Sequence, residues 1–282
     1  MYRLLGMDFS LQIFKYIQIN ILQFKNVYVI ITLVILITIV NEVKMMLTIK
    51  GLSKTYDNGK KAVDNIDLEI NDGDIFAFIG HNGAGKTTTI KCVVGLLDFE
   101  AGEVTINGYS IKKDPIAVKQ ITAYIPDNPD IYESLTGIQY LNFIADIYNI
   151  SKKSRYDDIA KYANGFELTK NLGDLISSYS HGMKQKLVLI SAFIRHPKLL
   201  ILDEPFVGLD PKAAFTVKQI MKEMCEEGAM VFFSTHVLEV AEKLCSRVAI
   251  IKKGQIIANG TMEEVKGNKS LEEVFLELEK NA

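Results

Sequence analysis

The sequence has few cysteines and no marked excess of either charge. Its three cysteines, Cys92, Cys225 and Cys245, are far apart and lack C-x-x-C spacing. This argues against a disulfide framework or a zinc site, and it indicates buried or idle thiols in a reducing compartment. The net charge of -2 provides no surplus of cations for phosphate backbones, so the composition does not favour a nucleic-acid-binding protein.

An apolar run long enough to cross a bilayer is also missing. The longest run, residues 27–40, has 14 apolar or threonine residues, which as a helix reach only ~21 Å against a hydrocarbon core of ~30 Å. We predict that residues 1–44 are a hydrophobic N-terminal extension that precedes the true translation start at Met45 or Met46. A weak membrane anchor, or an amphiphilic extension that packs on a membrane partner, is the alternative.

The most specific motif in the chain is a phosphate-loop pattern, G-x-x-x-x-G-K-[ST], at residues 80–87. It follows the apolar, strand-like run 75–79 and precedes a stretch expected to be helical from about residue 86 to 97. Such a loop curls so that its backbone N–H groups point at phosphate oxygens, and the helix N-terminus behind it adds positive potential. We expect a Cβ at Gly80, Gly83 or Gly85 to obstruct the turn or the ligand.

Most residues of this loop have an expected part in holding a polyphosphate and Mg²⁺. The loop backbone should cradle the phosphates, through Gly80, Asn82, Gly83, Ala84 and Gly85. Lys86 should supply charge to the β- and γ-phosphates, and the Thr87 hydroxyl should ligate Mg²⁺. Thr88 should face the phosphates or the backbone of its own helix.

The remaining pattern predicts an α/β protein with two additions. Residues 47–51 and 66–70 read as an antiparallel flap, joined by a turn that contains the aromatic Tyr56. A hairpin is expected at 103–107 and a strand at 121–125. Capping-box residues Thr136 and Gln139 then begin a helical insertion, and residues 132–196 as a whole are predicted to be an α-helical subdomain.

The sheet resumes with the apolar run 199–202, which ends on Asp203 and Glu204. Adjacent strand residues point in opposite directions, so one carboxylate can serve a metal and the other a water molecule. A helix from Asp210 to the stop at Gly228 should follow. The strand 230–234 then delivers Thr235 and His236 to the same edge, and strands at 248–252 and 255–258 complete the core.

The order and spacing of four features resemble an ABC transporter ATPase subunit over residues 46–282. These are the phosphate loop, the segment Ser180-His181-Gly182-Met183-Lys184-Gln185, the Asp203-Glu204 pair and His236. The resemblance implies a P-loop NTPase (RecA-like) core with an antiparallel β flap and an inserted α-helical subdomain, in an ABC ATPase domain spanning residues 45–282.

The resemblance also implies roles for single residues. Tyr56 matches the aromatic that stacks on adenine, and Asp203 matches the Mg²⁺ carboxylate. Glu204 matches the catalytic base and His236 the histidine that donates to the γ-phosphate, with Lys86 neutralising charge in the same reaction.

The family completes its site across a head-to-tail dimer, in which the signature segment of one chain caps the nucleotide held by the other. By resemblance, Ser180 and Gly182 would make this contact, and Asp210 would belong to the D-loop. The segment reads Tyr-Ser-His-Gly-Met in place of L-S-G-G-Q, which retains the serine and the second glycine. We expect activity to survive these changes.

A second departure concerns the Q-loop, where Asp127 stands in place of the family's glutamine. A carboxylate can bind Mg²⁺ or water, but it cannot donate a hydrogen bond when ionised. Asp127 is therefore a candidate for both nucleotide and metal contacts, and it makes the coupling to a partner differ from the family pattern.

The function implied is a Mg²⁺-dependent ATPase subunit of a transporter. One cassette without a bundle of membrane helices needs a separate integral-membrane permease and a second ATPase subunit, at the cytoplasmic face of the cell membrane. The tail 270–278 resembles the drug- and peptide-export (ABC-2-type) branch, so we expect export. The alternatives are a soluble ABC ATPase that acts on ribosomes or DNA, whose paired cassettes and long linkers are missing here, and a small-molecule kinase, which the signature segment and His236 disfavour.

Overall fold

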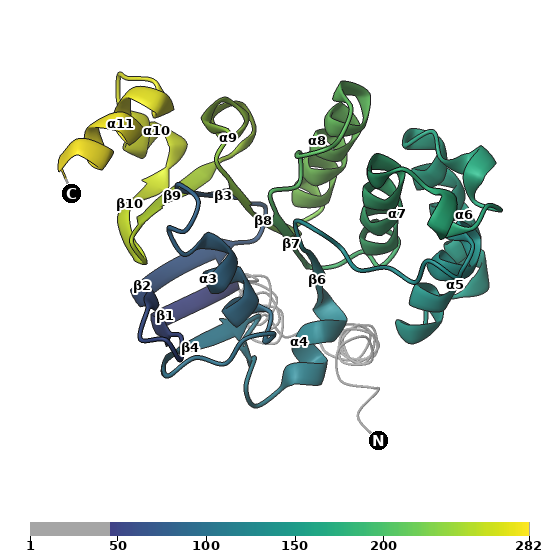
Figure 1. The fold of residues 1–282 in the computed structure, drawn as a ribbon, viewed down its shortest axis with the longest axis horizontal. Coiled ribbons are helices and arrows are strands. Elements are labelled where there is room, and N and C mark those ends of the chain that lie inside the picture. Colours follow the sequence, from purple (N-terminus) through teal and green to yellow (C-terminus); the bar gives the residue numbers. More distant parts are fainter. Residues whose placement is uncertain (1–45, 282) are drawn as a thin grey trace, which may run out of the picture. The chain divides into compact units, whose positions relative to one another are not determined.

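A computed structural model describes residues 46–281 of the chain (Figure 1). The predicted N-terminal extension lies outside the described residues, so the domain boundary at Met45 stays a prediction. Between residues 46 and 281, no helix is long and apolar enough to cross a membrane.

Ten strands of the described chain form two sheets. The smaller sheet is antiparallel, in the order β2-β1-β4-β5, with β1 at Met46–Thr55, β2 at Lys61–Asn71, β4 at Ala101–Ile106 and β5 at Tyr109–Ser110. The larger sheet has the order β10-β9-β3-β8-β7-β6, with β3 at Ile75–Ile79, β6 at Thr122–Ile125, β7 at Leu199–Asp203, β8 at Met230–Thr235, β9 at Arg247–Lys252 and β10 at Gln255–Thr261. All pairs in the larger sheet are parallel except β9 with β10.

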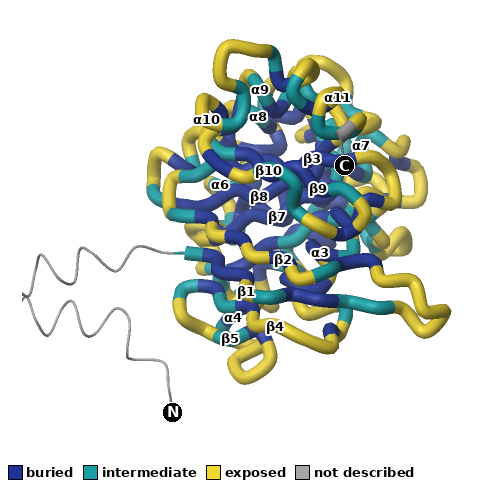
Figure 2. Tube along the Cα trace, turned by 90° about the vertical axis from the view of Figure 1, so that its left-hand side faces the viewer, coloured by how far each residue is buried: buried dark blue, intermediate teal, exposed yellow. Residues whose placement is uncertain are grey.

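The parallel strands are buried on both faces, which explains their unbroken apolar sequences. Alternate residues of β3 enter two different cores: Phe76 and Phe78 face the smaller sheet and α3 (Lys86–Val93), whereas Ala77 faces the helices on the other side. Figure 2 shows β3, β8 and β7 as a dark-blue centre within more exposed segments. The predicted α/β class is confirmed.

The predicted antiparallel flap is confirmed and is longer than expected. Strands β1 and β2 pair in the register Leu47 with Ile70, and bulges interrupt the pairing beyond Ile49. Both strands extend toward the linker that carries Tyr56, because the irregular pairing continues as far as Thr55 opposite Lys61. The flap thereby brings the linker to the edge of the larger sheet where the phosphate loop begins.

The sequence predicted two helices of the core with bounds, the phosphate-loop helix and the helix that begins after Asp210. The phosphate-loop helix α3 ends at Val93, four residues before the predicted end, and Gly95 beyond it adopts a positive φ of 70°. Helix α4 (Pro115–Ile121) was not predicted, and it takes Ile121 out of the expected strand. The other core helices are α8 (Pro211–Glu226), α9 (Leu238–Leu244), α10 (Met262–Lys266) and α11 (Leu271–Asn281).

Three helices occupy the stretch predicted as a helical insertion, and in Figure 1 they gather beside α8, on the side away from the flap. They are α5 (Gly137–Ile147), α6 (Lys152–Gly165) and α7 (His181–Phe193). The predicted capping box is present, since Thr136 Oγ1 accepts from Gln139 N at 3.3 Å and Gln139 Oε1 accepts from Thr136 N at 2.8 Å.

Candidate functional site

The phosphate loop connects β3 to α3 and is enclosed by backbone from two other strands. A Cβ on Gly80 would lie 2.5 Å from the carbonyl oxygen of Ile251 in β9. A Cβ on Gly85, which has a φ of 115°, would lie 2.4 Å from the carbonyl oxygen of Ala62 in β2. At these two positions, glycine is required because the loop packs directly against neighbouring backbone, which the sequence did not indicate.

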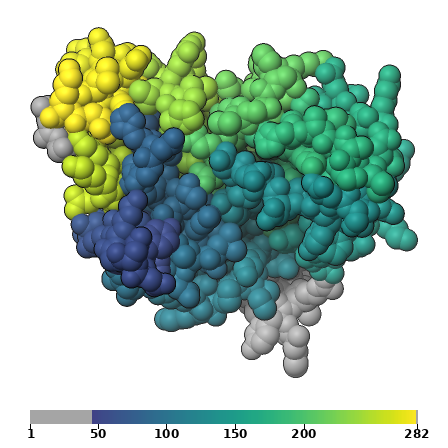
Figure 3. Space-filling view, viewed as in Figure 1, coloured from purple at the N-terminus to yellow at the C-terminus, as the bar shows by residue number. Residues whose placement is uncertain are grey.

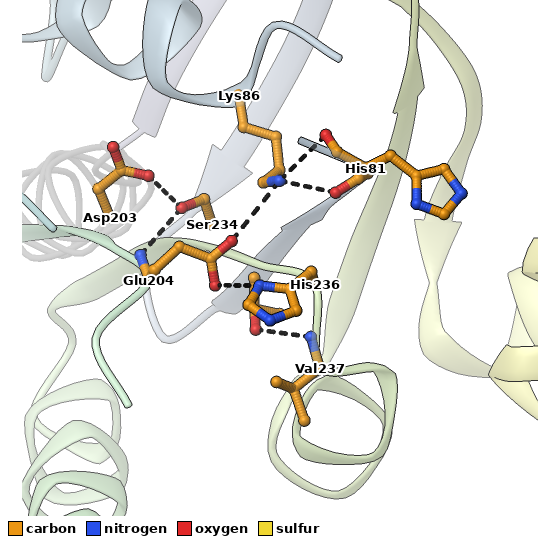
Figure 4. Close-up of polar contacts among 9 residues, drawn as sticks. His81, Lys86, Asp203, Glu204, Ser234, His236 and Val237 are labelled. Carbon is orange, nitrogen blue, oxygen red and sulfur yellow. Dashed lines mark hydrogen bonds and ion pairs between the residues drawn. The ribbon is translucent and has the colours of Figure 1, made fainter. Parts of the chain in front are cut away.

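Lys86 lies inside the loop with only 6% of its side chain exposed. Its ammonium donates to the carbonyl oxygens of Gly80 at 2.6 Å and His81 at 3.4 Å, and lies 3.5 Å from Glu204 Oε1 (Figure 4). A buried ammonium needs such partners. The loop therefore holds the charge of Lys86 at one point, next to the end of β7.

The loop residues border a cavity of about 330 Å³, large enough for the phosphate part of a nucleotide. Three of the lining residues, Lys60, Ala62 and His81, were not predicted. The others are most of the residues predicted to hold nucleotide or metal: Tyr56, Asn82, Gly83, Gly85, Lys86, Thr87, Thr88, Asp127, Asp203 and Glu204. The structure thus brings together residues from the flap linker, the loop and the carboxyl ends of β6 and β7.

The two carboxylates at the end of β7 are held by one serine that sequence reasoning missed. Ser234 pairs with Asp203 in the β7–β8 register, and its hydroxyl donates to Asp203 Oδ1 and accepts from Glu204 N at 3.0 Å. Ser234 stands two positions before the predicted His236, at the end of β8, and this position was the signal available in the sequence. Ser234 is fully buried, so it fixes both acidic residues relative to β8.

One expectation about this pair is wrong. Glu204 does not continue the strand: β7 ends at Asp203, and Glu204 adopts a positive φ of 50°. Strand alternation therefore does not explain why the two carboxylates point differently. The cause is the turn at Glu204, a left-handed conformation that is uncommon for a residue with a Cβ and is found where a side chain is re-aimed.

His236 follows β8 and faces Glu204. Its Nδ1 lies 3.0 Å from Glu204 Oε2, and the imidazole is half exposed (Figure 4). The other carboxylate oxygen, Oε1, is buried and accepts no hydrogen bond; its nearest cation is the ammonium of Lys86. Glu204, which lines the cavity, thus lies between the loop lysine and the histidine.

Tyr56 and Asp127 lie at the rim. The Tyr56 hydroxyl is 3.0 Å from Thr88 Oγ1, so Thr88 faces the flap linker as well as the cavity. Asp127 is exposed. Burial raises the pKa of the neighbouring Tyr124, and the negative charges of Asp203 and Asp127 raise it further. Tyr124 therefore stays neutral beside the two carboxylates.

Six predicted site residues do not line this cavity: Gly80 and Ala84 of the loop, His236, and the more distant Ser180, Gly182 and Asp210. Ser180 caps α7 and accepts from Met183 N at 3.3 Å, with Gly182 in the first turn of the helix. Asp210 caps α8 by accepting from Ala213 N at 2.8 Å and pairs with Lys186 at 2.6 Å, and these two bonds lower its pKa. Within one chain, the signature segment and the D-loop aspartate are thus separate from the phosphate loop.

The residues present fit a Mg²⁺ ion that is shared with phosphates. No group of three or more His, Cys, Asp or Glu residues in the described part of the chain forms a metal cage. The cavity instead offers the Thr87 hydroxyl and the carboxylates of Asp203 and Asp127, hard oxygen donors of the kind that bind Mg²⁺ together with substrate phosphates and water.

The three cysteines do not line the cavity. All three are buried free thiols. Burial raises the pKa of Cys92 to about 11 and that of Cys225 to about 12, so neither is a nucleophile at neutral pH.

Comparisons with known proteins agree with this geometry. The family model described as ABC transporter matches residues 63–207. The chain is 35% identical over 240 residues to the ABC-type transporter ATP-binding protein EcsA of Bacillus subtilis, covering 83% of this chain and 97% of EcsA. It is 34% identical over 224 residues to the linearmycin resistance ATP-binding protein LnrL of the same organism, covering 78% and 70% of the two chains.

Solved structures give the same result. An ATP-binding subunit of an ABC transporter superposes with a TM-score of 0.80 at 35% identity, covering 83% of this chain and 99% of that one. The cassette MJ0796, solved as a dimer in a post-hydrolysis state bound to ADP and phosphate, has the same fold with a TM-score of 0.69 at 22% identity, covering 77% and 98%.

Proposed function

The chain belongs to the family of ABC transporter ATP-binding proteins, and we propose that it is the ATP-hydrolysing subunit of a transporter whose membrane pathway is formed by a separate permease. The observation that carries this proposal is that Glu204, which lines the cavity together with Lys86, contacts both Lys86 and His236. A cation for phosphates, a base and a second polar group aimed at the same place are what transfer of a phosphoryl group to water requires.

The parts of the reaction divide among these side chains. Lys86 exchanges its loop carbonyls for the β- and γ-phosphate oxygens, which the loop N–H groups also bind. Glu204 orients the attacking water and accepts its proton, because it lines the cavity beside the lysine that binds the phosphates. His236 fixes the orientation of Glu204 and donates to the γ-phosphate.

Two further contacts complete binding of Mg²⁺-ATP. Thr87 and Asp203, with Asp127 also lining the cavity, would hold Mg²⁺, which would supply charge neutralisation for the phosphates. Tyr56 is 38% exposed at the rim, which leaves a ring face for stacking on adenine.

A second cassette completes the site. Ser180 and Gly182 lie at the N-terminus of α7, where backbone N–H groups attract phosphate, but they do not line the cavity of their own chain. In a head-to-tail dimer, the N-terminus of α7 would contact the nucleotide bound by the partner. The signature segment makes this contact in the family. The dimeric state of MJ0796 is consistent with this arrangement.

The direction of transport is proposed to be outward. The C-terminal segment resembles that of the export branch, and the name of the relative LnrL refers to resistance. We therefore propose an exporter, with this subunit bound peripherally at the cytoplasmic face of the cell membrane through its permease.

Purification of the tagged chain from detergent-solubilised membranes tests the proposal. We expect an integral-membrane permease to copurify and the complex to hydrolyse ATP when Mg²⁺ is present. Copurification with ribosomes, or a complex that binds ATP without turnover, would contradict it. Transport of candidate compounds into inverted vesicles then tests direction, because an exporter accumulates its substrate inside them.

A further inference from the structure

His81, at the second position of the phosphate loop, faces two ways. Its carbonyl oxygen accepts from the Lys86 ammonium at 3.4 Å and from Ala84 N at 3.1 Å, so its backbone belongs to the nucleotide cradle. Its imidazole points away from Lys86 (Figure 4). A residue that contacts this ring can therefore affect the conformation of the loop without touching the reacting atoms.

The ring contacts the C-terminal helix α11. It lies edge-on to Phe275, with ring centroids 5.0 Å apart and an interplanar angle of 67°. Its Nε2 lies 3.6 Å from Glu279 Oε2, one helical turn further along α11. Figure 3 shows the yellow C-terminal segment beside blue, earlier parts of the described chain on this face.

Helix α11 is itself held in place by buried side chains and by hydrogen bonds at both ends. Leu271 is fully buried and Phe275 is 5% exposed, both within the core that contains β9 and α9. The Leu271 amide donates to Glu242 Oε2 of α9 at 3.1 Å. At the other end, Lys252 of β9 donates to the carbonyl oxygen of Glu279 at 2.6 Å.

From these contacts we infer that α11 positions the phosphate loop through His81, with Phe275 and Glu279 as the positioning residues for the nucleotide site that the proposed function assigns. The loop must hold several N–H groups and two carbonyls in one arrangement before phosphate arrives, and restricting His81 reduces the ordering cost of binding. None of the three side chains contacts Glu204 or His236. The effect should therefore fall on nucleotide affinity, while the chemical step is left unchanged.

Titration with a fluorescent ATP analogue, combined with steady-state ATPase kinetics on the full chain, tests this inference. His81→Ala and Glu279→Gln should each raise the Kd and the KM for ATP by about fivefold, while kcat changes by less than about twofold. His81→Gln, whose amide nitrogen can still reach Glu279, should retain most of the affinity. Because His81 and Glu279 meet, the double variant should cost less than the sum of the single changes.

Glu272→Gln, a change to an exposed carboxylate in the first turn of α11, is the matched control and should leave Kd unchanged. An unchanged Kd in both His81→Ala and Glu279→Gln, or a loss confined to kcat, would overturn the role of α11. Failure of the unaltered chain to bind the analogue would instead overturn the proposed function itself.

Discussion

His236 Nδ1 and Glu204 Oε2 lie 3.0 Å apart, although the two residues are 32 positions apart in the sequence. They meet because β7 and β8 are parallel neighbours whose carboxyl ends lie at the same edge of the sheet. The contact orients the carboxylate next to the cavity. Removing either partner should therefore affect turnover more than binding.

Glu204→Gln tests the base directly. We expect kcat to fall about a hundredfold to ten-thousandfold, because an amide cannot accept the proton of the attacking water. ATP affinity should be retained, since Lys86 and the loop carry most of the binding energy, and an ATP-bound dimer should accumulate on size-exclusion chromatography. Glu239→Gln, at an exposed carboxylate on α9, is the control. Turnover near that of the unaltered chain would remove Glu204 from the proposed role.

Lys86→Ala should act on an earlier step. It removes the charge that meets the β- and γ-phosphates and leaves Glu204 Oε1 buried without its nearest cation. We expect the Kd for ATP, measured by fluorescent analogue titration, to rise about tenfold or more. Lys91→Ala, an exposed lysine on the same helix, should bind ATP normally. Equal affinity of the Lys86 and Lys91 variants would contradict the role of Lys86.

Ser234→Ala should lower turnover although it substitutes neither Asp203 nor Glu204. The hydroxyl holds Asp203 and also accepts from the Glu204 amide, so its loss loosens both groups. We expect kcat to fall about tenfold and half-maximal activity to require more Mg²⁺. Ser191→Ala removes another buried hydroxyl, which donates to the carbonyl oxygen of Val188 at 2.7 Å and does not line the cavity, and so controls for the lost buried hydroxyl. A Mg²⁺ requirement equal in both variants would argue against this role of Ser234.

Asp127 is expected to serve communication with the permease. Asp127→Ala should leave ATP binding nearly intact and reduce the hydrolysis that the permease stimulates, whereas Asp127→Gln, which restores the amide of the family, should cost less. The measurement is the ATPase rate with and without the copurified permease in lipid, with Asp130→Ala in the same exposed loop as control. Equal fractional losses in both conditions would mean that Asp127 serves the chemistry instead.

A chain that starts at Met45 should bind Mg²⁺-ATP as tightly as the full chain. The described residues that line the phosphate cavity lie between Tyr56 and Glu204, and they include the side chains proposed to hold the phosphates and the metal. Isothermal titration of both forms measures this, and the intact mass of the native protein shows which start the cell uses. Weaker binding by the shorter chain would make the extension part of the working protein.

Much of this site could be predicted because its chemistry is local in sequence. The loop, the Asp203-Glu204 pair and His236 each follow an apolar strand, and parallel strands bring such ends together. The turn at Glu204 could not be predicted, because its φ of 50° depends on the hydrogen bond from its amide to Ser234 on another strand. The same holds for His81, whose partner Phe275 lies almost at the other end of the chain.

Helix α4 was missed for a different reason. It has only seven residues, and Pro115 at its start and Ile121 at its junction with β6 suit a turn and a strand as well as a helix. The helix α5 was easier, because its capping box is written in four consecutive residues. Short elements with weak periodicity are decided by packing, which a single sequence does not display.

The pairing of β3 with β9 has a consequence for synthesis on the ribosome. Ser246, directly before β9, donates to the carbonyl oxygen of Ile75 across 171 positions of sequence. At ordinary elongation rates, roughly ten to thirty seconds pass between the emergence of these two segments. For most of that time Phe76 and Phe78 lack both neighbouring strands, β8 and β9, and the phosphate loop lacks the backbone of Ile251 that encloses it. The nascent chain therefore passes through a stage that exposes apolar strand surface to chaperones and cannot yet hold nucleotide.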